Sequence, residues 1–399
     1  MIMKRDKIFN AVFCGIIGGV CLYIPVHFML VHIGVVAKTS NDNQMVFEPI
    51  SEKNIGDKLS NKVNAIKTRL ENEITNSFPF YNSLNGLYQN FNYYMNSFFY
   101  KEVPLKTNSD NEYIFYNKEN DFYYLENQYS KDELDKRLDM QVAMFNKLAN
   151  LDIDMYLYFP TRYELTKLKD NNLNSYVDIF KDKLSLKIKV ANMDITSLEQ
   201  YKNYFYKTDH HWNMNGALAG YYDIMDILGK VPVDNLEVVN KRERKFYGSM
   251  AKSVLNNKTY DYILDVDKKL DYDVLVNGKQ ASEVFKPRQI RLDRDYLYYD
   301  YYVQYFNGQY GEICYDYHKD NEENLLILSD SYAWQIDYLI ASSFNKTYVV
   351  NLRYDKWKKE DLNLEEYMKK RNIKKVLFLY EGGSMMFDQY NYNLEGRIK

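Results

Sequence analysis

The chain of 399 residues is long enough to bury a sizeable core in one large domain or two modest ones. Its 52 lysines and arginines nearly balance 55 aspartates and glutamates without a basic tract, so nucleic acid is not an expected partner, because phosphate binding needs concentrated positive charge. Two of the three cysteines and two of the five histidines lie in the apolar N-terminal segment. The remainder has one thiol, which excludes a cysteine-based zinc site, and no metal ion or other cofactor is expected.

The first 37 residues have the pattern of a membrane anchor. Lys4, Arg5 and Lys7 precede residues 8–37, which are overwhelmingly apolar and exceed the roughly 20 residues that a membrane-spanning helix needs. The positive flank predicts a cytoplasmic N-terminus, with the large remainder on the other side of the cell membrane. A cleaved signal peptide ending at residues 35–37 (Val-Val-Ala) stays open as the alternative.

Residues 38–76 are predicted to form a polar linker and then a stalk helix. Apolar side chains recur there at spacings of three and four, namely at Leu59, Val63, Ile66, Leu70 and Ile74. The main extracytoplasmic domain is then expected over residues 77–399.

The first part of this domain alternates helix and strand patterns. A helical stripe consists of Leu134, Leu138, Val142, Phe145 and Leu148. Residues 153–159 follow as a short apolar strand before Pro160, and residues 186–193 form a weaker strand candidate. Another helix is predicted around residues 218–228.

Residues 234–320 interrupt this alternation. The segment is rich in aspartate and tyrosine, with short strand-like pieces such as residues 274–276 and with plausible tight turns. We expect an irregular insertion that leaves the sheet or caps a site.

The C-terminal part gives the clearest α/β pattern. Strands are predicted at residues 325–328, 347–352 and 376–380, with helices at about 332–344 and around 364–368. Strands that alternate with helices predict a doubly wound parallel sheet. A ligand site is then expected beyond the carboxyl ends of the strands.

The sequence Thr-Asp-His-His-Trp-Asn at residues 208–213 concentrates two of the few histidines. An aspartate beside a histidine can hold the imidazole in one tautomer, as a general base requires. In an extended segment Asp209 and His211 would point to the same side and His210 away from it. We therefore predict His211 as the base and Asp209 as its orienting partner, with His210 as a substrate contact or a structural residue; an inert polar turn remains the alternative.

Ser331 follows a predicted buried strand and precedes a predicted helix. A serine at such a position can be exposed above the sheet, beside backbone N–H groups that stabilise developing negative charge. It can also serve merely as the helix N-cap. Together with Asp209 and His211, it would complete a Ser-His-Asp set for nucleophilic acyl chemistry.

These two segments resemble the signature of the DHHW protein family. That family is similar to the SGNH-hydrolase-like domain of alginate O-acetyltransferases, in which a Thr-Asp-x-His-Trp motif precedes a strand-end Asp-Ser. Residues 208–213 fit the first element and residues 329–332 (Ser-Asp-Ser-Tyr) the second. Further familiar pieces, at residues 78–81, 159–161, 246–249 and 351–354, extend the likeness over about residues 45–385.

The resemblance implies a circularly permuted SGNH-like fold, because the Asp-x-His precedes the serine. It also implies O-acetyl transfer to, or removal from, a cell-surface polysaccharide, with Ser331 as nucleophile and a multipass membrane acyltransferase as the possible acetyl donor. For oxyanion or substrate contacts we expect the Ser331 backbone N–H, His210, Tyr332, Asn351 and Arg353. A non-catalytic protein that binds glycan or a partner on the same fold is the competing hypothesis.

Overall fold

The computed structural model describes residues 23, 26, 81–107, 112–127, 129–169, 172–281, 297–305, 308–354, 357, 359–388 and 394–399. The chain divides into two compact units, Met1–Phe91 and Asn92–Lys399. Apart from the helical Tyr23 and Val26, the predicted membrane span, linker and stalk helix lie outside the described residues, as do the boundaries at residues 37 and 76. Within the described part, no helix combines the length and the apolar character needed to cross a membrane.

An eight-stranded mixed sheet forms the centre of the second unit, with the order β5-β4-β13-β11-β12-β10-β8-β9. Five neighbouring strands are parallel: β4 (Asp154–Pro160), β5 (Ile188–Met193), β11 (Asn324–Ser329), β12 (Lys346–Val350) and β13 (Ile373–Leu379). Three antiparallel strands extend the sheet at one edge: β8 (Asp273–Val276), β9 (Lys279–Gln280) and β10 (Glu312–Asp316). The parallel strands confirm the α/β prediction, since both of their faces are covered.

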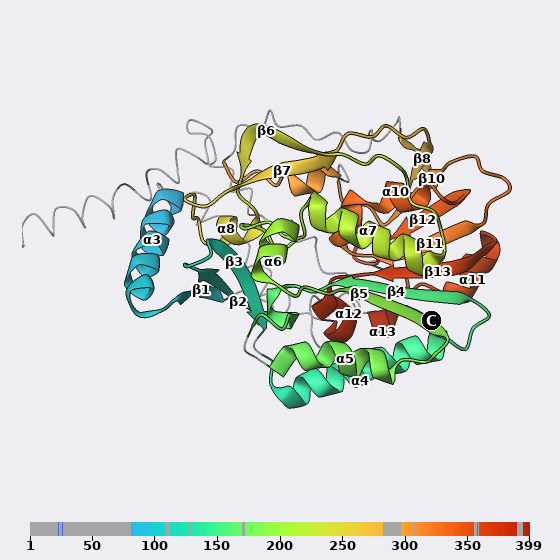
Figure 1. The fold of residues 1–399 in the computed structure, drawn as a ribbon, viewed down its shortest axis with the longest axis horizontal. Helices are drawn as coiled ribbons and strands as arrows, with labels where there is room; N and C mark the ends of the chain where they lie inside the picture. The colour runs from blue at the N-terminus through green and yellow to red at the C-terminus, as the bar shows by residue number, and fades with distance from the viewer. Residues whose placement is uncertain are drawn as a thin grey trace, which may run out of the picture. The chain divides into compact units, whose positions relative to one another are not determined.

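Helices cover the two faces of this sheet (Figure 1). One face packs on α7 (Met214–Leu228) and α10 (Asp337–Ala341). The other packs on α4 (Lys131–Leu148), α5 (Ser175–Lys183), α11 (Leu364–Lys370), α12 (Gly382–Phe387) and α13 (Leu394–Arg397). The result is the layered architecture that strand-helix alternation favours.

Local sequence explains where the predicted helices begin and end. Ser130 caps α4 by accepting a hydrogen bond from the Glu133 backbone N–H, and every residue of the predicted stripe is buried. Asn213 caps α7 in the same way, and Gly229 ends it in the left-handed conformation (φ 66°). The helix predicted over 332–344 is instead broken into the 3-10 turn η4 (Ser331–Gln335) and α10.

Two smaller sheets complete the second unit. One is antiparallel and consists of β1 (Glu102–Thr107), β2 (Glu112–Asn117) and β3 (Phe122–Asn127). The other pairs β6 (Val238–Phe246) with β7 (Asp261–Val266). The helix α3 (Tyr81–Phe99) crosses the boundary between the two units. The other described elements are short: η1 (Tyr163–Leu165), η2 (Asn172–Asn174), α6 (Leu198–Tyr204), α8 (Ser249–Ser253) and η3 (Tyr302–Tyr305).

Two sequence predictions need correction. The main sheet is mixed and not wholly parallel, and residues 234–320 are not simply an excursion, because β8, β9 and β10 come from them. These strands are short, and their apolar runs are at most three residues long, so they lack the longer apolar run of a central parallel strand.

Candidate active site

The Asp-His-His segment lies in a closed loop between α6 and α7. Phe205 and Trp212 form an isolated antiparallel bridge across its base. The backbone N–H of Tyr206 donates to the His211 carbonyl (3.2 Å), and that of Asn213 donates to the Tyr204 carbonyl (2.8 Å). The residues between these pairs therefore form a bend, and not the extended segment that the sequence suggested.

Asp209, His211 and Ser331 form a continuous hydrogen-bonded chain. Asp209 Oδ1 lies 2.5 Å from His211 Nδ1, and His211 Nε2 lies 2.7 Å from Ser331 Oγ. Asp209 Oδ1 also accepts from the His211 backbone N–H at 3.0 Å, which turns the loop back on itself. The predicted pairing of Asp209 with His211 is therefore present, but an aspartate turn produces it and not strand alternation.

The charge of Asp209 fixes the proton positions in this chain. Burial would raise its pKa, but the neighbouring His211 and His210, together with hydrogen bonds from His211 and from the Ser249 N–H (2.6 Å to Oδ2), lower the pKa well below the ordinary value. A carboxylate only accepts hydrogen bonds, so His211 Nδ1 donates to Asp209. His211 Nε2 is then unprotonated and accepts from the Ser331 hydroxyl, which is the arrangement that activates a serine nucleophile.

Glycine at position 248 lets the loop approach β6 and α8. A Cβ there would lie 2.3 Å from Asp209 Cβ and 2.6 Å from the Thr208 carbonyl oxygen, so only glycine fits without a shift. Thr208 Oγ1 accepts from the Gly248 N–H (3.0 Å) and donates to Asp261 Oδ2 (2.6 Å). Gly248 and Asp261 thus position the loop, a role that the sequence did not reveal, although residues 246–249 belong to the segments that carry the family resemblance.

The turn that carries Ser331 begins where β11 ends. The buried Asp330 caps η4 by accepting from the Tyr332 N–H (2.9 Å), so the N-cap role considered for Ser331 belongs to Asp330. Its other oxygen accepts from the Glu381 N–H at 2.9 Å. Burial raises the pKa of Asp330 to about 6. Ser331 itself is half-buried, and its backbone N–H has no hydrogen-bond partner among the described residues.

Besides the bond between His211 and Ser331, two further hydrogen bonds join the turn to the histidine loop. Trp212 Nε1 donates to the Tyr332 carbonyl at 3.0 Å. The Tyr332 hydroxyl donates to the His210 carbonyl. Tyr332 is buried and its hydroxyl is used internally, which argues against the substrate contact predicted for it.

Tyr302 is a site residue that the sequence did not indicate, since tyrosine is abundant in the chain. Its ring stacks on the His211 imidazole with a centroid separation of 3.7 Å and an interplanar angle of 13°. Its hydroxyl donates to the Ser331 carbonyl at 3.1 Å. Tyr302 therefore contacts both His211 and Ser331 and restricts the rotation of the imidazole.

His210 has a different environment from His211, although the two rings are only 4.0 Å apart. Its Nδ1 lies 2.8 Å from Ser249 Oγ, and the side chain is half-buried. Burial first, and the neighbouring His211 second, lower the pKa of His210 to about 3. The side chain is therefore neutral at physiological pH, and its Nδ1 is engaged by Ser249 and not by Ser331.

The remaining predicted contacts, Asn351 and Arg353, follow β12 at the same sheet edge as Ser331. Asn351 Oδ1 accepts from the Arg353 N–H at 3.0 Å, so Asn351 shapes its own turn. Asn351 is buried and Arg353 is exposed. The oxyanion or substrate roles expected for these two residues stay predictions.

A buried ion cluster lies at the ends of the neighbouring strands. Arg162, just after β4, pairs with Glu381 (Nε to Oε1, 3.0 Å) and with Glu164 (Nη2 to Oε1, 2.7 Å). Glu381 also caps α12 by accepting from the N–H groups of Gly383 and Ser384. Because the Glu381 backbone binds Asp330, this cluster supports the turn that carries Ser331.

Asp209, His210 and His211 are close enough together to be considered as metal ligands. Both ring nitrogens of His211 are already bound, however, to Asp209 and to Ser331. A metal ion bound to His211 would have to break one of these two hydrogen bonds, so the three side chains fit proton transfer better than metal binding.

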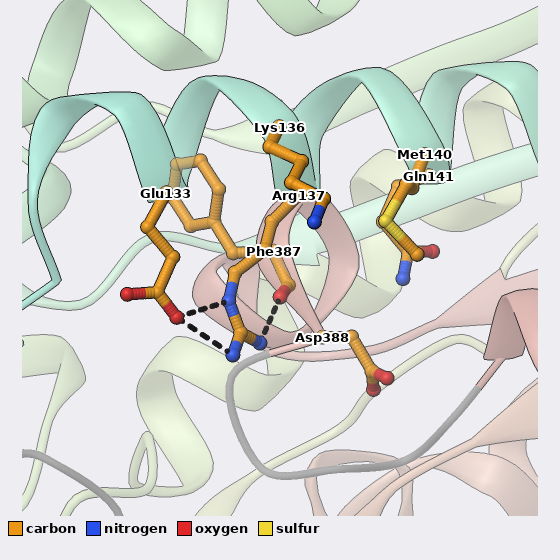
Figure 2. Close-up of a pocket in the computed structure, with 7 residues that line it drawn as sticks. All are labelled: Glu133, Lys136, Arg137, Met140, Gln141, Phe387 and Asp388. Atoms are coloured by element: carbon orange, nitrogen blue, oxygen red, sulfur yellow. Dashed lines mark hydrogen bonds and ion pairs between the residues drawn. The ribbon is translucent and has the colours of Figure 1, made fainter.

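A cavity of about 240 Å³ lies away from these residues, between α4 and the end of α12 (Figure 2). Arg137 crosses it, bound to Glu133 and to the Phe387 carbonyl, and Gln141 also lines it. Phe387 packs in the core on the sheet face opposite to Trp212, so this cavity is separate from the Asp-His-Ser chain.

Solved structures share this fold at low sequence identity. The chain is similar to Bacillus cereus PatB1, with a TM-score of 0.57 and 21% identity over 71% of this chain and 100% of that chain. PatB1 with a sulfonyl adduct gives a TM-score of 0.56, with 20% identity over 71% of this chain and 99% of that chain. A DHHW family protein from Eubacterium siraeum gives a TM-score of 0.53, with 16% identity over 72% of this chain and 96% of that chain. The resemblance predicted from the motif thus holds for the fold.

No protein-family model matches the sequence, and no curated protein matches it either.

Proposed function

We propose that the protein is an O-acetyltransferase or acetylesterase that acts on a cell-surface polysaccharide through a serine acyl-enzyme. The observation that carries the proposal is the chain from Asp209 through His211 to Ser331, with 2.7 Å between His211 Nε2 and Ser331 Oγ. The fold shared with a DHHW family protein supports it. In fold terms, the α/β domain with its parallel-rich sheet would be a circularly permuted SGNH-like hydrolase domain.

In the first half-reaction, Ser331 Oγ attacks the acetyl carbonyl carbon and its proton passes to His211 Nε2. The tetrahedral intermediate then collapses, and the donor's alcohol oxygen leaves with the proton from His211. Acetyl-Ser331 remains. Asp209 stays ionised throughout and stabilises the imidazolium that forms beside it.

In the second half-reaction, a sugar hydroxyl or water attacks acetyl-Ser331 and gives its proton to His211. The Ser331–acyl bond breaks and Ser331 Oγ takes the proton back. The Ser331 N–H, to which no described residue is bound, would stabilise the oxyanion in both steps, and Asn351 and Arg353 are the other donors that we propose. Whether sugar or water attacks decides between transfer and hydrolysis.

We propose a location outside the cytoplasm, attached to the cell membrane by residues 8–37, which would bring the domain close to surface polysaccharide. A multipass membrane acyltransferase would be a suitable source of acetyl groups in this arrangement.

The competing hypothesis of a non-catalytic binding protein predicts Ser331 and His211 too far apart for proton transfer. A distance of 2.7 Å favours the enzyme.

The test is an esterase and transfer assay on the full chain in detergent. With p-nitrophenyl acetate the protein should release p-nitrophenolate, and Ser331→Ala should reduce kcat/KM by at least about a thousandfold. A neutral oligosaccharide acceptor should divert acetyl groups from water to sugar if the enzyme is a transferase. An unchanged rate in Ser331→Ala would overturn the proposal.

A further inference from the structure

The helix α3 exposes a broad apolar face. Leu87, Phe91, Tyr94, Met95, Phe98 and Phe99 are between 50% and 85% exposed. At 3.6 residues per turn these positions cover an arc of about 140° on one side of the helix. Monomeric soluble proteins rarely expose a continuous apolar face of this kind unless it meets a partner or a membrane.

The opposite side of the helix is fixed to the domain. Tyr93 packs edge-on against Tyr116 of β2, with ring centroids 5.6 Å apart. Asn96 Nδ2 donates to the carbonyl of Pro104 in β1 at 3.2 Å. The C-terminal half of α3 is therefore held with its apolar side chains exposed, and the exposure does not come from a loose helix end.

The composition of α3 indicates which kind of partner its exposed face fits. None of its 19 residues is charged. A helix that pairs with a second helix presents a narrow seam flanked by charges that set partner and register. A wide face of phenylalanine, tyrosine, leucine and methionine is instead typical of a helix that lies in the membrane interface, where tyrosine is enriched.

Lysines gather at the end of this face. Lys258 Nζ lies 4.0 Å from the centroid of the Tyr94 ring, and Lys118 Nζ donates to the Ser97 carbonyl at 3.3 Å. Lys101 follows the helix but pairs with Glu119. Lys118 and Lys258 are exposed, and thus give the rim of the apolar face a positive charge that complements anionic headgroups.

We infer that the exposed face of α3 lies in the interface of an anionic lipid bilayer, with Phe98 and Phe99 among the acyl chains and Lys118 and Lys258 at the headgroups. A membrane span at residues 8–37, as the sequence predicts, would keep the chain at a bilayer. The inference goes beyond the proposed chemistry and does not depend on it.

Brominated lipids test this directly, because they quench tryptophan fluorescence only inside the bilayer. The native Trp212, Trp334 and Trp357 are at most 5% exposed and give a constant background. The full chain carrying Phe98→Trp is reconstituted into vesicles of phosphatidylcholine and phosphatidylglycerol with brominated acyl chains. The matched control is Leu186→Trp, at a fully exposed turn before β5. Circular dichroism checks that both variants are folded.

We expect at least half of the added fluorescence to be quenched in Phe98→Trp and none in Leu186→Trp. Adding Lys118→Glu and Lys258→Glu should weaken the quenching in anionic vesicles and leave it unchanged in pure phosphatidylcholine.

Three outcomes would contradict the inference. The first is that the fluorescence added by Phe98→Trp is not quenched. The second is that the emission of this variant shifts to the blue with protein concentration in detergent, since this indicates a second copy on the face. Equal quenching with and without the lysine reversals would overturn the role of the anionic headgroups.

Discussion

At the scale of single residues, adjacent histidines have different chemistry because their partners differ. His211 is bound at both ring nitrogens, to an ionised Asp209 and to the Ser331 hydroxyl. His210 is bound to a neutral Ser249 hydroxyl, and its pKa of about 3 leaves it uncharged above about pH 4. The conspicuous pair thus contains one candidate base and one neutral neighbour.

Replacing each histidine by glutamine separates these roles. His211→Gln should lower kcat/KM for an acetyl ester by about 10²–10⁴, the usual contribution of a general base. His210→Gln should lower kcat/KM by less than tenfold. It should not change how the rate depends on pH between pH 5 and pH 8, because His210 is uncharged over this range. Steady-state kinetics from pH 5 to 8 makes the comparison. A larger loss in His210→Gln than in His211→Gln would reverse the assignment.

The types of the site residues decide which of them the sequence could reveal. His211 stands out because histidine is scarce, Asp209 because it stands beside the histidines, and Ser331 because it follows a predicted strand. Tyr302 does not stand out among 41 tyrosines, and its stacking on His211 depends on a tertiary contact that no spacing encodes. The hydrogen bond from Thr208 to Asp261 of β7 was missed as well, because it joins residues that are far apart in the sequence.

At the scale of elements, the loop between α6 and α7 depends on a close approach to α8. Its position is fixed by Gly248, where a side chain would meet Asp209, and by the Ser249 N–H that binds the carboxylate of Asp209. The loop and the N-terminus of α8 thus act as one support for the catalytic carboxylate.

Gly248→Ala should therefore impair catalysis more than folding. The added methyl group displaces Asp209, and a shift of about 1 Å in such a group can reduce the rate about a hundredfold. Gly278→Ala is the matched control: its left-handed φ of 79° makes alanine unfavourable by about 1–2 kcal/mol, but no atom lies within 4 Å of the new Cβ. Melting temperature and kcat/KM are measured for both. The prediction fails if the two variants lose stability and activity in the same proportion.

The sequence predicted strands correctly where their apolar residues form a continuous run. The strands β4, β11 and β13 are buried on both faces, and their sequences show it. The strands β1, β2 and β3 were missed for two reasons. The proline in β1 counts against a strand, and the short apolar and aromatic runs of β2 and β3 do not by themselves distinguish a strand from a buried helix. The break between η4 and α10 at Ile336 was also missed, since no proline or glycine marks it.

At the scale of the whole molecule, the site is assembled at the carboxyl edge of the parallel strands. Arg162 after β4, Asp330 and Ser331 after β11, and Glu381 after β13 come from adjacent strands of the sheet. This edge was predicted from the strand-helix alternation. The antiparallel extension by β10, β8 and β9 was not, because pairing between distant short strands is set by long-range contacts.

The buried Asp330 links this edge to the stability of the fold. Its pKa is about 6, above its ordinary value of 3.8, mainly because of burial. Relative to the unfolded chain, the folded state therefore favours the protonated form, and stability from this group is lost as pH rises from about 4 to about 6. The difference in free energy of unfolding between the wild type and Asp330→Asn should fall by up to about 3 kcal/mol between pH 4 and pH 7. Urea denaturation at both pH values measures it, and a constant difference would show that Asp330 does not titrate in this range.

The most direct test of the account is to trap the acyl-enzyme. The full chain is mixed with p-nitrophenyl acetate, stopped in acid and digested, and the peptide that contains Ser331 is examined by mass spectrometry. We predict one added acetyl group on Ser331, its absence in Ser331→Ala, and much slower labelling in His211→Ala. Acetylation elsewhere with Ser331 unmodified, or equally fast labelling of Ser331 in His211→Ala, would contradict the proposed Ser-His-Asp mechanism.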